Sequence, residues 1–144
     1  MAKYNPVVHF EMPYENRDRA AKFYESAFGW KMSKLGAEMG NYMTAETSET
    51  GKDRMVKLPG TINGGFYQKM PDPSSHAPSV VIAVEDLEAA MKKVVQAGGQ
   101  IMSKKPEDIP GVGRWVSFRD SEGTRVSMLQ PKRMEYSEKV GGKK

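Results

Sequence analysis

The chain contains the same order of elements twice, and this internal repeat limits its possible folds more than any other feature. Two helical segments align at an offset of 69 residues, so that Ala20–Ala21 falls on Ala89–Ala90 and Gly29 falls on Gly98. A fixed offset across half of a chain indicates an internal repeat. Neither half has enough apolar area to cover both a helix and a sheet face alone, so we expect two modules within one domain.

The first module begins with a strand whose two faces differ. Side chains alternate along Val7–Met12, so Phe10 lies on an apolar face while His9 and Glu11 share the opposite one. Asn16 can cap the following helix, whose apolar residues recur at helical spacing. These are Ala20, Phe23, Tyr24, Ala27 and Phe28. The apolar face should pack under the helix and the polar face should line a pocket, because an unpaired buried carboxylate is unfavourable.

The remaining chain divides into short strands on either side of a proline-rich linker. Module one, about 5–69, continues with strands at 30–35, 41–46 and 61–69, the last containing Gly64–Gly65. The linker, Met70–Pro78, has three prolines and no periodicity, so we expect it to be exposed. Module two, about 79–131, starts with a strand at 79–84 and a helix that Asp86 can cap. Its helical stripe is Leu87, Ala90, Met91, Val94 and Val95, followed by strands at 100–103, 114–119 and 124–130, with a loop at 104–113.

Composition restricts the possible chemistry and location. The chain has 144 residues and no cysteine, which excludes disulfides, thiolate catalysis and cysteine-based zinc sites. The sequence has no apolar run long enough to cross a membrane, and its start lacks the apolar centre of a signal peptide, so we expect a cytoplasmic protein without a membrane partner. The net charge is +4, with part of the excess in a basic tail at 132–144 that is expected to be mobile. No nucleic-acid-binding motif is found, so nucleic acid is not an expected partner.

Several local motifs resemble a known superfamily. The first helix ends in F-Y-x-x-x-F-G-W at 23–30, the second ends in Ala97–Gly99, and a D-x-x-G turn at Asp120–Gly123 precedes the last strand. Together with His9 and the I-P-G-V-G loop at Ile109–Gly113, they make the chain similar to the vicinal oxygen chelate superfamily. This superfamily includes glyoxalases, extradiol dioxygenases and bleomycin-resistance proteins, and the resemblance is strongest to its small, glyoxalase-related bacterial members.

The resemblance implies a fold and an assembly. It covers roughly 7–130 and implies an α+β fold of two βαβββ modules, the glyoxalase-like paired repeats. The modules would form a cupped mixed sheet with the helices on the outer face, as a single domain over 1–131. Relatives of this length usually form homodimers, and the cup is where they bind small molecules.

The resemblance also implies where a metal would bind. In metal-dependent relatives the ligands come from the first, fourth, fifth and eighth strands. The corresponding positions in this chain are His9, Gly64–Gly65, Ser79 and Ser127. Only His9 is a good ligand for a divalent transition metal, because glycine has no side chain and serine hydroxyls bind such metals poorly. Glu11 and His76 are the candidates to complete a divalent-metal site with His9.

A pocket without a metal is the other interpretation of these positions. His9 can act as a general base with Glu11 as its orienting partner, so these two are the predicted catalytic residues. The predicted substrate-binding residues are Gly65, Tyr67, Ser79, Trp115, Arg125 and Ser127. Two structural alternatives stay open, because His9 can serve only as a hydrogen-bonded strand residue and Trp115 can belong to the core.

Two functions are compatible with such a pocket. The first is a small-molecule-binding enzyme, a lyase or isomerase acting on a carbonyl or diol metabolite, with most of the usual metal ligands absent. The second is a non-catalytic protein that sequesters a toxic molecule, of the bleomycin-resistance type. Turnover that a chelator abolishes would favour the first, and stoichiometric binding without product would favour the second.

Deletion of Met134–Lys144 tests the interpretation of the tail. We expect the free energy of unfolding to change by less than about 1 kcal/mol, because polar termini without an apolar stripe rarely bury surface. Denaturant unfolding of the full chain and of the truncated chain measures the difference. A loss of several kcal/mol would show that the tail packs against the domain.

Overall fold

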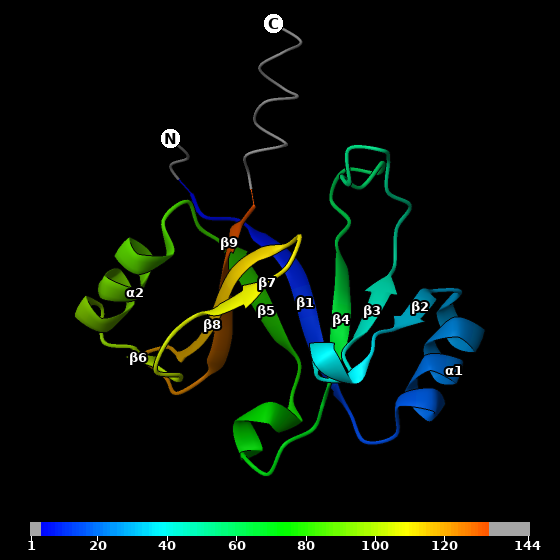
Figure 1. Ribbon diagram of the computed structural model, residues 1–144, viewed down its shortest axis with the longest axis horizontal. Coiled ribbons are helices and arrows are strands. Elements are labelled where there is room, and N and C mark those ends of the chain that lie inside the picture. Colours follow the sequence, from blue (N-terminus) through cyan, green and yellow to red (C-terminus); the bar gives the residue numbers. More distant parts are fainter. Residues whose placement is uncertain (1–3, 133–144) are drawn as a thin grey trace, which may run out of the picture. The chain divides into compact units, whose positions relative to one another are not determined.

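The computed structural model describes residues 4–132 (Figure 1). Within this range the chain forms nine β-strands and two α-helices, and the predicted α+β fold class is confirmed. The described residues fall into two compact units, one comprising 8–80 and the other comprising 4–7 with 81–132. Of the basic tail predicted at 132–144, all but Lys132 lies outside the described residues.

The first unit has the predicted βαβββ order. Its elements are β1 (Val7–Tyr14), α1 (Arg17–Phe28), β2 (Lys31–Lys34), β3 (Met43–Glu46) and β4 (Asn63–Gln68). The strands are arranged β2-β3-β4-β1, and α1 lies alongside β2 (Figure 1). β1 and β4 are parallel, whereas β3 is antiparallel to both β2 and β4. The helix thus provides the crossover that parallel pairing of two strands requires.

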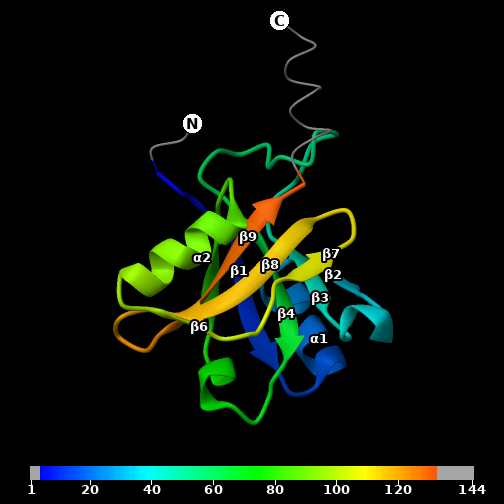
Figure 2. The same cartoon turned by 60° about the vertical axis from the view of Figure 1, so that its left-hand side comes forward.

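The second unit repeats this order and adds one short strand, β7 (Glu107–Ile109). Its other elements are β5 (Ser79–Ala83), which begins at the end of the first unit, α2 (Leu87–Gln96), β6 (Gln100–Ile101), β8 (Gly113–Arg119) and β9 (Arg125–Pro131). The strands are arranged β5-β9-β8-β6, with β5 and β9 parallel. Figure 2 shows β8 and β9 side by side along the length of this unit. The mixed pairing matches that of the first unit.

One strand was not predicted. β7 lies in the segment 104–113, for which the sequence predicts only a loop, and it pairs with the start of β8 as an antiparallel hairpin. Gly113, the first residue of β8, has a φ of 145°, a backbone conformation that favours glycine. The prediction failed because Glu107 and Asp108 are charged and exposed, so this edge strand has no apolar alternation to identify it.

Both helices begin at the predicted caps. The Asn16 side chain accepts a hydrogen bond from the backbone N–H of Arg19 at 2.9 Å. The Asp86 side chain accepts one from Ala89 at 3.1 Å. Each cap pairs a backbone donor that the first helical turn cannot satisfy. At the other end of α1, Gly29 adopts the left-handed conformation with a φ of 73°, which ends the helix as its sequence predicts.

Each unit has its own core, and the helix stripes are only partly as predicted. In the first unit, Ala20, Ala21 and Tyr24 of α1 pack against the core, but Phe23 and Phe28 are 56% and 63% exposed. The inner face of α1 therefore runs through positions 20, 21 and 24, and the two phenylalanines lie beside it, where they contact the Tyr24 ring. In α2 the predicted stripe packs as expected except for Val95, which is exposed.

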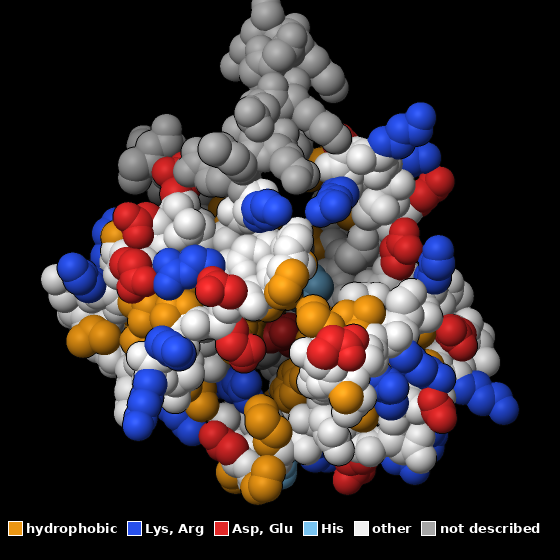
Figure 3. All heavy atoms as spheres, viewed as in Figure 1, with side chains coloured by type: hydrophobic (Ala, Val, Ile, Leu, Met, Phe, Trp, Pro, Cys, Tyr) orange, Lys and Arg blue, Asp and Glu red, His pale blue; other side chains and the backbone are white. Residues whose placement is uncertain are grey.

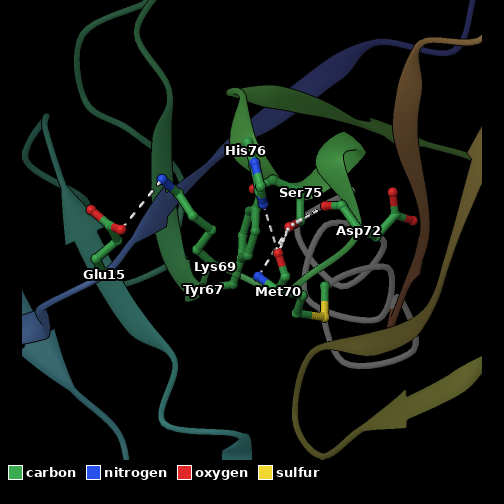
Figure 4. A network of polar contacts seen from close by, with 7 residues as sticks. All are labelled: Glu15, Tyr67, Lys69, Met70, Asp72, Ser75 and His76. Atoms are coloured by element: carbon green, nitrogen blue, oxygen red, sulfur yellow. Dashed lines mark hydrogen bonds and ion pairs between the residues drawn. The ribbon is translucent and has the colours of Figure 1, made fainter.

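The linker is more ordered than its composition predicts. Its centre forms a short 3-10 helix, Pro73–His76, and Ser75 is completely buried, so the expectation of an exposed segment is wrong at this residue. The Ser75 hydroxyl accepts a hydrogen bond from the backbone N–H of Met70 and lies 2.8 Å from the Asp72 carbonyl oxygen. Figure 4 shows Tyr67 reaching into the same network, where its hydroxyl donates to the Ser75 carbonyl at 2.8 Å.

The surface carries charges of both signs. Lysine and arginine side chains are interspersed with aspartate and glutamate on the face shown in Figure 3. Some form exposed ion pairs, such as Lys57 with Glu49 and Arg114 with Glu88. Such pairs contribute little to stability, because water screens them. Among the described residues, neither α-helix has the length and hydropathy needed to cross a membrane.

The two neighbouring serines of the linker provide a matched test of this network. Ser75→Ala should lower the free energy of unfolding by about 1–3 kcal/mol, because it removes a buried hydroxyl and leaves its partners unpaired. Ser74→Ala is the control, since the buried Ser74 hydroxyl makes no hydrogen bond within residues 4–132. We expect that change to stay within about 0.5 kcal/mol in denaturant unfolding. Equal losses for both variants would contradict the assigned role of Ser75.

Candidate functional site

The polar face of β1 carries the two predicted catalytic residues. β1 pairs in parallel with β4, and this register sets His9 opposite Asn63 and Glu11 opposite Gly65. The intervening Phe10 packs against the core of the first unit, as strand alternation requires. Glu11 is only 9% exposed, and His9 is partly buried. Burial makes the hydrogen-bond partners of both side chains important.

Tyr42 joins these two residues, and the sequence analysis missed it. Its hydroxyl oxygen lies 3.1 Å from His9 Nε2 and donates a hydrogen bond to Glu11 Oε2 at 3.3 Å. The alternation of the run before and in β3 gives a signal that could have identified it. Met43 and Ala45 are buried in the core, so Tyr42 and Thr44 belong to the opposite face of that strand.

A tight turn holds Tyr42 in place. Gly40 and Asn41 both have a positive φ, 66° and 56°, so the chain reverses directly before Tyr42. The Tyr42 carbonyl then accepts a hydrogen bond from the backbone N–H of Leu35 at 2.8 Å. Asparagine tolerates this left-handed conformation better than most residues. The turn before Tyr42 and the hydrogen bond to its carbonyl oxygen together fix the backbone of this residue.

The glycine pair of β4 makes room for two aromatic side chains of the protein itself. A Cβ atom at Gly65 would lie 2.0 Å from the Tyr42 hydroxyl oxygen, and one at Gly64 would lie 2.5 Å from the Phe10 ring. Such distances are far below van der Waals contact, so both positions require glycine while these rings stay in place. The space that the sequence assigns to a ligand at Gly65 contains the Tyr42 phenol.

Burial sets the protonation of the three side chains. It lowers the pKa of His9 to about 4, so the imidazole is neutral at pH 7. Burial also raises the pKa of Tyr42, and the charge and hydrogen bond of Glu11 raise it further, so the phenol keeps its proton. That single proton is donated to Glu11. His9 Nε2 must then carry the ring proton and donate to Tyr42, which leaves the imidazole lone pair on Nδ1.

The other predicted residues of the first unit have different surroundings. The Tyr67 hydroxyl donates to the Ser75 carbonyl at 2.8 Å and lies 3.2 Å from the Ala77 carbonyl, so Tyr67 connects β4 to the linker. Ser79 lines an open, apolar groove of about 410 Å³, together with Phe10, Met12, Trp30, Thr47, Pro78 and Val80. Tyr67 also contributes through its charge to the raised pKa of Tyr42, so it lies near the site.

The predicted residues of the second unit share one face of its sheet. Trp115 pairs with Leu129, and Ser117 pairs with Ser127, across β8 and β9. Directly opposed residues of antiparallel strands point to the same face of the sheet, so Trp115, Arg125 and Ser127 share one face. The core residues Val116 and Met128 lie on the other face. Trp115 is thus not part of that core. The catalytic and binding roles of all these residues stay predictions.

The donors of the described residues do not fit a protein-bound divalent metal. A stable site needs three or more protein ligands around the ion. Among residues 4–132, no three histidine, aspartate or glutamate side chains are close enough to share one. His9 and Glu11 therefore belong to no such group. His76, the other candidate, has its Nε2 2.8 Å from the Met70 carbonyl oxygen in the linker (Figure 4).

The low pKa of His9 predicts how stability depends on pH. An unfolded histidine takes up a proton below about pH 6.5, but folded His9 does so only near pH 4. The contribution of neutral His9 to the free energy of unfolding is complete above pH 6.5. As the pH falls towards 4, this contribution is lost, and the free energy of unfolding decreases by at most about 3 kcal/mol. Unfolding of wild type and His9→Gln between pH 7 and pH 4 measures this loss, with His76→Gln as the control. If the free energy of unfolding of His9→Gln falls with pH as steeply as that of wild type, the prediction is wrong.

Comparisons with known proteins identify relatives of the chain. CFP32 of Mycobacterium tuberculosis is 30% identical over 122 residues, which cover 84% of this chain and 42% of that protein. The anthracycline biosynthesis protein DnrV of Streptomyces peucetius is 30% identical over 130 residues, covering 85% of this chain and 46% of that protein. The chain thus spans less than half the length of either relative. A glyoxylase-like domain-containing protein of Didymella fabae is 29% identical over 125 residues. This match covers 85% of this chain and 91% of that protein.

Solved structures agree on the fold. Methylmalonyl-CoA epimerase of Streptomyces coelicolor superposes with a TM-score of 0.65 at 11% identity, covering 89% of this chain and 98% of the epimerase. A sequence model of the Glyoxalase/Bleomycin resistance protein/Dioxygenase superfamily matches residues 7–128. This match covers most of the chain and coincides with the paired βαβββ modules. The protein therefore belongs to the Glyoxalase/Bleomycin resistance protein/Dioxygenase superfamily, the vicinal oxygen chelate proteins that its sequence resembles.

Proposed function

We propose that this protein binds a small carbonyl or diol compound beside His9, Tyr42 and Glu11 and acts on it by proton transfer, as an isomerase or lyase. The observation that carries the proposal is the hydrogen-bonded chain of these residues, in which Tyr42 connects a neutral imidazole to a largely buried carboxylate. Acid–base catalysis needs positioned groups of this kind. The superfamily supplies the expectation of a small-molecule ligand.

The protonation of the site indicates which reactions it suits. With Nε2–H donated to Tyr42, the Nδ1 lone pair of His9 is available to accept a proton. A base with a pKa of about 4 is weak, so the substrate proton must be acidified by an adjacent carbonyl group. Removal of that proton from carbon leaves the electron pair in an enolate. Return of a proton to the opposite face of the same carbon, or to a neighbouring carbon, gives an isomer. Departure of a leaving group from the enolate gives a lyase reaction.

The relatives support an isomerase reaction in general outline only. Solved structures with this fold include methylmalonyl-CoA epimerases, and epimerases are isomerases. Their identity to this chain, 11% and 16%, supports the fold and not a shared substrate. Tyr67, Ser79, Trp115, Arg125 and Ser127 remain our proposed ligand-binding residues. A homodimer and a cytoplasmic location are parts of the same proposal.

The apolar groove favours a second candidate, a protein that sequesters an aromatic molecule without reaction. Phe10, Met12 and Trp30 line this groove of about 410 Å³. Aromatic walls bind flat apolar ligands through stacking. The superfamily includes bleomycin-resistance proteins, and one relative is named for anthracycline biosynthesis. Quenching of tryptophan fluorescence on stoichiometric binding, without product, would support this alternative.

Deuterium exchange tests the first candidate without knowledge of the natural substrate. A panel of 2-oxo and 3-oxo acids and thioesters is incubated with the protein in D₂O, and NMR follows loss of the proton next to the carbonyl. We expect His9→Gln to slow enzyme-dependent exchange at least about tenfold, because the proton acceptor is lost. His76→Gln, which changes the other histidine, should not slow it.

Stability separates a catalytic role of His9 from a structural one. At pH 7, His9→Gln should barely change the melting temperature, since glutamine can still donate to Tyr42. If melting falls by many degrees while ligand binding or exchange survives, His9 is structural and the proposal fails. An absence of exchange with every compound, combined with tight binding of one, would favour sequestration instead.

A further inference from the structure

Tyr42 occupies the space beside His9 that a metal ion would need. A divalent metal bound to an imidazole nitrogen lies about 2.0–2.1 Å from it. The Tyr42 oxygen lies 3.1 Å from His9 Nε2 and is hydrogen-bonded to that nitrogen. A metal along the same direction would stand roughly 1 Å from the phenol oxygen, about half the length of a metal–oxygen bond. The phenol and the metal therefore exclude each other at Nε2.

The same hydroxyl also replaces part of the electrostatic role of a cation. Glu11 is nearly buried, and a buried carboxylate needs a compensating charge or hydrogen-bond donors. Tyr42 donates its proton to Glu11 Oε2 at 3.3 Å. Tyr42 thus hydrogen-bonds to both His9 and Glu11, the two side chains that would otherwise be available to an ion.

Gly65 makes this arrangement possible. The resemblance places a metal ligand of β4 at the glycine pair, and a side chain at position 65 would begin 2.0 Å from the Tyr42 oxygen. A ligating side chain at position 65 and the Tyr42 phenol therefore cannot coexist in this geometry. The absence of a side chain at position 65 and the presence of the Tyr42 phenol beside it therefore depend on each other in this structure.

We infer that the Tyr42 hydroxyl takes the place of the divalent metal in this protein, and that Gly65 is the residue that admits it. The site then recognises its ligand through hydrogen bonds from neutral groups and not through a cation. This inference concerns the same residues as the proposed function. Its tests use metal ions and protein stability without any substrate, so its failure can be distinguished from a failure of that proposal.

Metal titration is the first test. All proteins carry His76→Gln, which removes the other histidine, and Co²⁺ binding is measured by calorimetry and visible absorption. The chain with Tyr42 and Gly65 unchanged should bind no stoichiometric Co²⁺ at His9. The double variant Tyr42→Ala/Gly65→Asp removes the phenol and adds a carboxylate beside His9 and Glu11, and should bind one Co²⁺ at least about tenfold more tightly.

Two results of the titration would overturn the inference. One is stoichiometric metal in the chain that retains Tyr42 and Gly65, lost again on His9→Gln. The other is a folded double variant that binds Co²⁺ no more tightly than that chain.

A thermal double-mutant cycle is the second test, and it remains informative if the metal-binding variant does not fold. Gly65→Ala should lower the melting temperature by several degrees when Tyr42 is present and by much less in a Tyr42→Ala background, because the clash has been removed. Gly64→Ala is the matched control. Its Cβ atom would meet the Phe10 ring, so its loss should be the same in both backgrounds. Equal losses for Gly65→Ala in both backgrounds would contradict the inference.

Discussion

The hydrogen bonds of the Tyr42 hydroxyl are the interaction on which the polar face of the first unit depends. They connect Tyr42, which lies directly before β3, to two residues of β1. They give a buried carboxylate a donor and a partly buried imidazole an acceptor. Without them, two polar side chains of β1 would face the protein interior with fewer partners, which costs free energy. The need for glycine at position 65 and the location of the His9 ring proton on Nε2 both follow from this contact.

The two modules share a topology but differ in the packing of their cores. The core of the first unit is aromatic, with Phe10, Tyr24, Trp30 and Phe66 in contact around β1 and β4. The core of the second unit is mostly aliphatic, built from Leu87, Val116, Met128 and their neighbours. Large rings leave less space between elements, so the first unit needs its glycine pair where the second does not. The repeat thus conserves backbone order while the packing of each half is specific.

Much of the backbone could be predicted from sequence, because local signals were strong there. Asn16 and Asp86 act as caps, the alternation of β1 separates Phe10 from His9, and the repeat gives the second module its order. The failures occurred where local patterns carry no information about distant contacts. β7 has no apolar alternation, and Phe23 and Phe28 fit a helical stripe but lie beside the core. Ser75 is polar and lies in a proline-rich segment, yet it is completely buried. Tyr42 became a site residue only because the fold brings β3 beside β4.

The exclusion between Tyr42 and a side chain at position 65 has a consequence for how such a site can change during evolution. A substitution at Gly65 alone would force a collision with the phenol, and the loss of Tyr42 alone would leave a hole beside two polar groups. A lineage cannot pass between the two kinds of site through either single change without a less stable ancestor. Positions 42 and 65 should therefore covary among relatives, with glycine at one accompanying an aromatic hydroxyl at the other.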